Sequence, residues 1–161
     1  MLSVFFNVGF LVRFIMAVIG TVGFALIFNT RPRYLPMLGI GGGITYAIYY
    51  FFEVRVFVSV FAAAFLSSIF LALYSEVYAR IKRAPAIIFM IPCTVPIVPG
   101  SSLYYTMANL ISRDFDAALY HLGNTALIGI GIAGGILAVS ILVNVYMGIS
   151  VRVKANKKVK F

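Results

Sequence analysis

The sequence predicts an all-α integral membrane protein in which five transmembrane helices form a single domain over residues 1–161. Apolar residues make up 63% of the chain and charged residues 11%, far below the roughly 25% of an average soluble domain. Mean hydropathy is +1.06. Long uncharged runs separate the charged residues, and five of these runs reach the roughly 20 apolar residues that a membrane-crossing helix needs.

The first three spans are predicted at residues 8–29, 35–52 and 55–79. Arg13 interrupts the first run, and its long side chain can extend toward the membrane surface. The second run contains no charge. The third is uncharged as far as residue 75 and is predicted to continue helically to about residue 79.

The fourth and fifth uncharged runs are longer than one straight crossing requires, at about 1.5 Å per residue. The fourth span is therefore predicted at residues 85–111, broken near residues 96–100. The fifth span is predicted at residues 121–150. A basic tail at residues 152–161 follows, and we expect it to contact solvent or lipid headgroups.

The distribution of lysine and arginine predicts the topology, because cytoplasmic loops retain positive charge during insertion. With five helices, one side of the membrane receives Arg31, Arg33, Arg80, Lys82, Arg83, Arg152, Lys154, Lys157, Lys158 and Lys160. We therefore expect the N-terminus outside and the C-terminus in the cytoplasm. The first basic residue is Arg13, so no cleaved signal peptide is expected. Topology also explains the net charge of +9 better than nucleic-acid binding does.

Small residues recur at four-residue spacing on three of the predicted helices. They are Gly39, Gly43 and Ala47; Ala64, Ser68 and Ala72; and Gly131 with Gly135. This spacing places each set on one helical face and allows close helix packing in lipid. Because five helices form a thin bundle, we expect a partner chain, either a second copy or a distinct subunit.

The sequence contains no catalytic or metal-binding constellation. His121 is its one histidine and lies near a predicted outer helix end, and Cys93 is its one cysteine. No acidic pair lies within a predicted span. We therefore expect neither enzymatic activity nor a cofactor or metal ion.

Glu76 and Arg80 allow two interpretations. As an i, i+4 pair they stabilise the cytoplasmic end of the third helix by about 0.2 to 0.5 kcal/mol. Alternatively, Glu76 exchanges a proton or counter-ion with the cytoplasm, since acids at membrane depth tend to serve transport. Neutral polar residues in or beside spans are expected mostly to join helices, and in a minority to line a pore: Asn7, Asn29, Asn109, Asn124 and Asn144.

The stretch MIPCTVPIVPG contains Pro92, Pro96 and Pro99. Each proline lacks the N–H that a helix uses, and irregular backbone at membrane depth must face protein or a water-lined cavity. We expect a second half-helix with Ser101 or Ser102 as its N-cap. Free N–H groups at Gly100 and the two serines are then suited to bind an anion such as a substrate carboxylate. The alternative is a proline kink satisfied by neighbouring helices.

The string RAPAIIFMIPCTVPIVPGSSLY resembles the P…IP…PLVPGS…Y signature of the threonine/serine exporter family. FNTRPR after the first span and SEVYAR at the end of the third also resemble that family. The similarity is greatest to the small membrane-only subunit of bacterial two-component members. It implies export of threonine and serine, or of a dicarboxylate such as succinate, driven by the proton motive force across a bacterial plasma membrane. It also implies a larger partner subunit with a cytoplasmic domain and further helices.

Matched by position, the signature residues are Pro92, Pro96, Pro99, Gly100, Ser101 and Tyr104, with Asn29, Pro32, Glu76 and Arg80. Together with the broken helix, the resemblance predicts substrate binding by Pro96, Pro99, Gly100, Ser101, Ser102 and Tyr104, and proton coupling or gating by Glu76, Arg80 and Asn29. Alanine at Pro99 or Gly100 is then expected to abolish export. Two other functions stay open: a non-transporting scaffold or anchoring subunit for a partner protein, and a homo-oligomeric channel.

Overall fold

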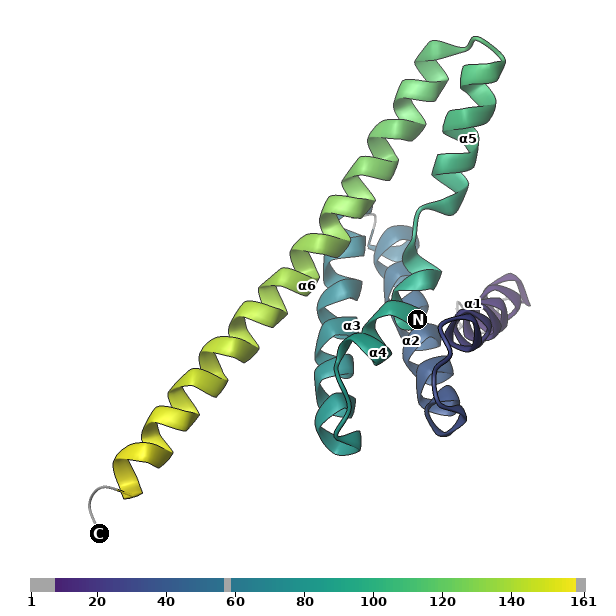
Figure 1. Cartoon of the computed structure of the whole chain (residues 1–161). Helices are drawn as coiled ribbons and strands as arrows, with labels where there is room; N and C mark the ends of the chain where they lie inside the picture. The colour runs from purple at the N-terminus through teal and green to yellow at the C-terminus, as the bar shows by residue number, and fades with distance from the viewer. Residues whose placement is uncertain (1–7, 57–58, 159–161) are drawn as a thin grey trace.

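The computed structural model describes residues 8–56 and 59–158, with side chains other than those of residues 55 and 147–158. All regular structure in these residues is helical (Figure 1). The elements are α1 (Val8–Ile27), the short 3₁₀ helix η2 (Pro32–Tyr34), α2 (Leu35–Arg55), α3 (Val60–Lys82), α4 (Ile87–Thr94), the 3₁₀ helix η3 (Val95–Ile97), α5 (Gly100–Ile111) and α6 (Phe115–Lys158). The predicted Asn7 lies outside the described residues.

Four stretches of the described chain are long and apolar enough to cross a membrane. They lie in α1, in η2 with α2, in α3, and in the first part of α6. The helices on either side of residues 98–99 pass the same test only together, with a bend of 51° between them, and supply a fifth span if the pair crosses as one. The predicted class, an all-helical multi-pass membrane protein, is therefore confirmed.

Helix α6 is longer than the span predicted at residues 121–150. It begins at Phe115 and continues to Lys158, within the predicted basic tail. Asp114 lies just before it and accepts a hydrogen bond from the N–H of Ala117 at 3.1 Å, which caps the helix start. The dipole of a helix favours acidic residues in its first turn, and Asp116 lies there. The end of the tail, 159–161, lies outside the described residues.

Helices α3 and α6 pack together more extensively than any other pair of the described elements. A Cβ atom on Gly131 would lie 2.7 Å from the backbone oxygen of Phe61, and one on Gly135 would lie 2.6 Å from the backbone oxygen of Phe65. Ser68 is fully buried in the same contact. The predicted packing through small residues is confirmed for these two helices, because only glycine allows backbones to approach this closely.

The glycines of α2 face two neighbours. A Cβ atom on Gly39 or Gly43 would contact Val18 of α1, at 3.2 and 2.8 Å respectively. Gly41 faces the other way, and a Cβ atom there would lie 2.9 Å from the sulfur of Cys93 in α4. Helix α2 therefore packs closely on both sides, and Gly41 allows α4 to approach its backbone.

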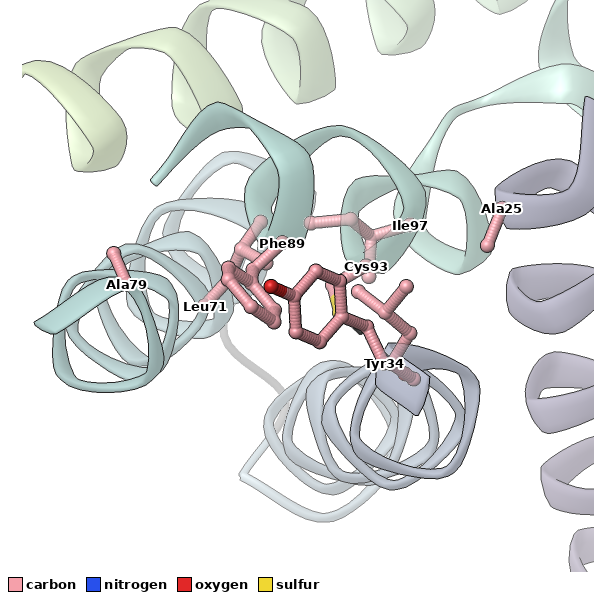
Figure 2. Close-up of a cluster of buried hydrophobic side chains, with 8 residues drawn as sticks. Ala25, Tyr34, Leu71, Ala79, Phe89, Cys93 and Ile97 are labelled. Atoms are coloured by element: carbon pink, nitrogen blue, oxygen red, sulfur yellow. Dashed lines mark hydrogen bonds between the residues drawn. The ribbon is translucent and has the colours of Figure 1, made fainter. Parts of the chain in front are cut away.

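The core of the described chain lies where α4 packs against α2 and α3 (Figure 2). The rings of Tyr34 and Phe89 lie 5.2 Å apart between centroids. Cys93 is buried and donates a hydrogen bond from its thiol to the backbone oxygen of Leu38 at 3.5 Å. These contacts anchor α4, so they set the position at which the chain breaks after it.

Helices α5 and α6 form a hairpin that extends away from the other helices (Figure 1). Among the described elements α5 packs chiefly against α6. Its apolar side chains remain substantially exposed, including Leu103, Met107, Leu110 and Ile111. The start of α5 is therefore placed by two things, the break that follows α4 and the packing of α5 on α6.

Candidate functional site

The fourth segment is divided into α4, η3 and α5 at Pro96 and Pro99, whereas Pro92 lies inside α4. Pro96 lies at the start of η3, where a missing N–H removes no helical hydrogen bond. Val98 is extended, with φ −63° and ψ 133°, as the steric clash with a following proline favours. Pro99 is the N-cap of α5. Two consecutive non-helical residues, Val98 and Pro99, therefore separate η3 from α5.

Hydrogen bonding at the start of α5 corrects two expectations. Pro99, rather than a serine, is the N-cap, and no side chain caps the helix. The N–H of Gly100 is not free, because it donates to the backbone oxygen of Val98 at 2.8 Å. The first helical bond runs from the N–H of Leu103 to Pro99 at 3.0 Å. Two N–H groups precede this bond and remain for another acceptor, those of Ser101 and Ser102.

A pocket of about 500 Å³ adjoins the break. Its lining residues are Tyr46, Tyr49 and Glu53 of α2, Val60 of α3, Pro96, Ile97, Val98 and Pro99 of the break, Ser101, Ser102 and Tyr105 of α5, and Tyr120, His121, Asn124 and Ile128 of α6. We call it the break pocket. It is within the size range of small-molecule sites.

Four of the six predicted substrate-binding residues line the break pocket: Pro96, Pro99, Ser101 and Ser102. Gly100 and Tyr104 do not. Tyr104 is 68% exposed, and a Cβ atom on Gly100 would have no neighbour within 4 Å. Since the first turn of a helix faces all directions, only some of its residues can face one cavity.

The break pocket has one acidic residue in its lining, Glu53, and neither lysine nor arginine. Tyr49 lies one helical turn before Glu53 and lines the same cavity. His121 stacks on the ring of Tyr105, with 5.3 Å between centroids. Polar groups from α2, α5 and α6 therefore converge on one cavity.

Sequence reasoning missed Glu53 and the tyrosines of this pocket. Glu53 follows the end of the second predicted span, residues 35–52, but it belongs to the last turns of α2. A usable signal was present, because Tyr46, Tyr49 and Glu53 follow the i, i+3, i+7 spacing of one helical face. Asn124 is one of the asparagines expected to join helices or to line a pore, and it lines the pocket.

The predicted coupling residues lie away from the break pocket. Glu76 and Arg80 are 4.0 Å apart between carboxylate and guanidinium, and the Arg80 side chain is 51% exposed, so this ion pair contributes little stability. Asn29 adopts a left-handed φ of 54° after α1. It lines a different pocket of about 330 Å³, at the other end of α2, together with Arg31, Arg33 and Arg83.

A polar pocket at a broken helix, within a bundle of membrane-length helices, is typical of a membrane transporter for small solutes. The sequence matches the protein family described as Threonine/Serine exporter, ThrE, over residues 13–142. The chain belongs to this family, and the resemblance noted from its motifs is confirmed. The family consists of exporters, in agreement with the prediction of a non-enzymatic membrane protein. No solved structure matches the chain.

Proposed function

We propose that this chain is one subunit of a heteromeric secondary exporter in a bacterial plasma membrane, driven by the proton motive force. Its cargo is a small metabolite with a carboxylate: threonine, serine, or a dicarboxylate such as succinate. The observation that carries the proposal is the break pocket, which collects Pro96, Pro99, Ser101 and Ser102 around one cavity. Membership of the threonine/serine exporter family supports the same function.

The start of α5 provides the groups for a carboxylate. The N–H groups and hydroxyls of Ser101 and Ser102 are donors at the positive end of the helix dipole, and both serines line the cavity. Hydrogen bonds from such donors to a charged acceptor are short and strong. Pro96 and Pro99 act indirectly. They lie at the start of η3 and at the cap of α5, and so place the first turn of α5 beside the pocket.

With the N-terminus outside, the break pocket lies toward the outer side of the membrane. Glu53 near the end of α2 and Val60 at the start of α3 then belong to the outer half, whereas Arg31 and Arg83 lie at the cytoplasmic ends. The core that contains Tyr34, Phe89 and Cys93 lies between the pocket and the cytoplasmic side. Export therefore requires α4 to move against α2 and α3.

A partner subunit is proposed because α5 has little cover. Its exposed apolar residues, among them Met107 and Ile111, have no neighbours in the described chain that bury them. The implied partner is the larger subunit with a cytoplasmic domain and further helices. Such a subunit would complete both the bundle and the enclosure of the pocket.

The function is tested by reconstituting the chain with its partner in proteoliposomes that carry a pH gradient. We expect labelled threonine, serine or succinate to accumulate against its own gradient, and collapse of the pH gradient to stop accumulation. Downhill flux without accumulation would indicate a channel. No movement of any of the three by the folded complex would favour the scaffold or anchoring subunit.

Alanine at Pro99 is expected to reduce export by about tenfold or more while the protein still inserts in the membrane, because loss of the fixed φ lets the turn before α5 relax. Alanine at Gly100 is the matched control. We now expect it to be tolerated, since a Cβ atom there meets nothing within 4 Å. The measurement is the initial export rate at equal amounts of protein in the membrane. Equal losses of export in both variants would contradict a specific role of Pro99.

For Glu76 we propose a role in proton coupling at the cytoplasmic end of α3. The change Glu76→Gln then removes the pH dependence of export while substrate binding stays within about twofold, since the residue lies outside the break pocket. Export rates of the complex at several internal pH values test this. An unchanged pH profile would contradict this role and would leave Glu76 and Arg80 as an ion pair that stabilises the helix end.

A further inference from the structure

We infer that Glu53 binds the ammonium group of the substrate and makes the break pocket selective for amino acids over dicarboxylates. The inference rests on the proposed export function and adds what that function leaves open, the chemical class of the cargo. It depends on the charges in the pocket lining and on which helices supply them.

The charge of the lining is the first argument. Glu53 is the one acidic side chain among the lining residues, and lysine and arginine are absent from them. A dicarboxylate would bring two negative charges to a cavity that already holds one and offers no guanidinium or ammonium. An amino acid brings one positive charge to Glu53, and a charge removed from water needs such a partner.

The position of the opposite groups is the second argument. Glu53 lies on α2, and Ser101 and Ser102 lie on α5, so the acceptor and the donors reach the same cavity from different helices. An α-amino acid carries its ammonium group and its carboxylate on the same carbon atom, so both charges enter the cavity side by side. The break pocket has a matching arrangement, with the acid on one helix and the hydroxyl and N–H donors on the other.

The aromatic residues support binding of a cation. Tyr46 and Tyr49 line the pocket on the same face of α2 as Glu53. Tyrosine rings attract an ammonium group through their π faces, by an effect that grows when water is excluded. Tyr49 lies one helical turn before Glu53, so its ring lines the cavity beside that carboxylate.

A competing role for Glu53 is to balance the charge of Arg13. Arg13 of α1 acts electrostatically on Glu53, but it is not part of the break pocket. It lines a neighbouring pocket with Tyr46 and Pro96. Among the described residues, the one carboxylate within 4.0 Å of a basic group is that of Glu76, which pairs with Arg80. Glu53 and Arg13 are therefore farther apart than a direct ion pair. If charge balance were the whole role, removal of Arg13 would affect transport as removal of Glu53 does.

The first test uses the unmodified complex in proteoliposomes. Transport of labelled threonine is measured with three unlabelled competitors: serine, succinate, and 2,3-dihydroxybutyrate, which is threonine with a hydroxyl in place of its ammonium group. We expect serine to compete and the other two to compete at least about tenfold more weakly. Equal competition by the hydroxy acid overturns the inference and leaves the export function intact.

The second test uses variants of the same complex. Glu53→Gln is expected to weaken threonine binding by about tenfold or more, and Glu53→Asp to restore part of it. Asp116→Asn, which removes an exposed carboxylate outside the pocket, is the matched control and should change nothing. Equal losses in Arg13→Gln and Glu53→Gln, or unchanged affinity in Glu53→Gln, overturn the inference. If Glu53→Gln fails to fold, the competitor series alone decides. Absence of any transport by the unmodified complex overturns the proposed function as well.

Discussion

Alanine at Gly135 is expected to separate α3 from α6 and to destabilise the protein more than other single methyl additions in the described helices. The added Cβ atom would lie 2.6 Å from the backbone oxygen of Phe65 and would also meet the hydroxyl of Ser68. Backbone atoms cannot move aside as a flexible side chain can, so the helices must shift. Overpacking of this kind costs about 1–3 kcal/mol. The midpoint of thermal unfolding in detergent and the monodisperse fraction after solubilisation measure it.

Gly129→Ala is the matched control for Gly135→Ala. Both positions lie on α6, but a Cβ atom on Gly129 has no neighbour within 4 Å. We expect this variant to be as stable as the unmodified protein or slightly more stable, because alanine favours the helix by roughly 0.5–1 kcal/mol over glycine. Equal stability of the two variants would mean that α3 and α6 do not pack as described.

Phenylalanine at Ser102 is expected to reduce export by about tenfold or more, since a cavity filled by a side chain has no room for a ligand. The variant should still fold and insert in the membrane. Ser102 lines the break pocket from the first turn of α5. The large ring would occupy the cavity between α2 and α5 and remove a hydroxyl donor. Initial rates of threonine export at equal membrane levels provide the measurement.

Leu103→Phe is the control for Ser102→Phe. Leu103 is the next residue of α5, is 42% exposed and does not line the pocket. It adds a ring to the same helical turn on a different side. Export by this variant should stay close to that of the unmodified protein. Normal export by Ser102→Phe would show that the break pocket is not on the substrate path.

Several local features of the fold were predictable from the sequence, because they depend on neighbouring residues. The apolar runs indicate membrane-length helices, and the spacing of Gly131 and Gly135 indicates a close contact. The prolines indicate an interruption close to Pro99. The predicted N-cap was two or three residues off: a serine is the better capping side chain, but the helix begins at Gly100 and Pro99, with a non-helical ψ of 55°, is its cap.

The candidate site was predictable in part. Ser101, Ser102 and the prolines were found because they share one short stretch with the break. Glu53 and His121 were not, since they lie far from that stretch in the chain and near the ends of other predicted helices. A single charge at the end of an apolar run is usually a loop residue, and nothing local distinguishes one that faces a cavity.

By itself, the sequence determined that the protein is helical, crosses a membrane several times and interrupts its fourth apolar segment, since these follow from hydropathy and from the missing N–H groups of prolines. Only the tertiary structure decided which residues surround the interruption. The packing of α4 on α2 and of α5 on α6 brings Glu53, Ser102 and His121 to one cavity. Such convergence depends on contacts between distant segments, and the local pattern of residues does not encode it.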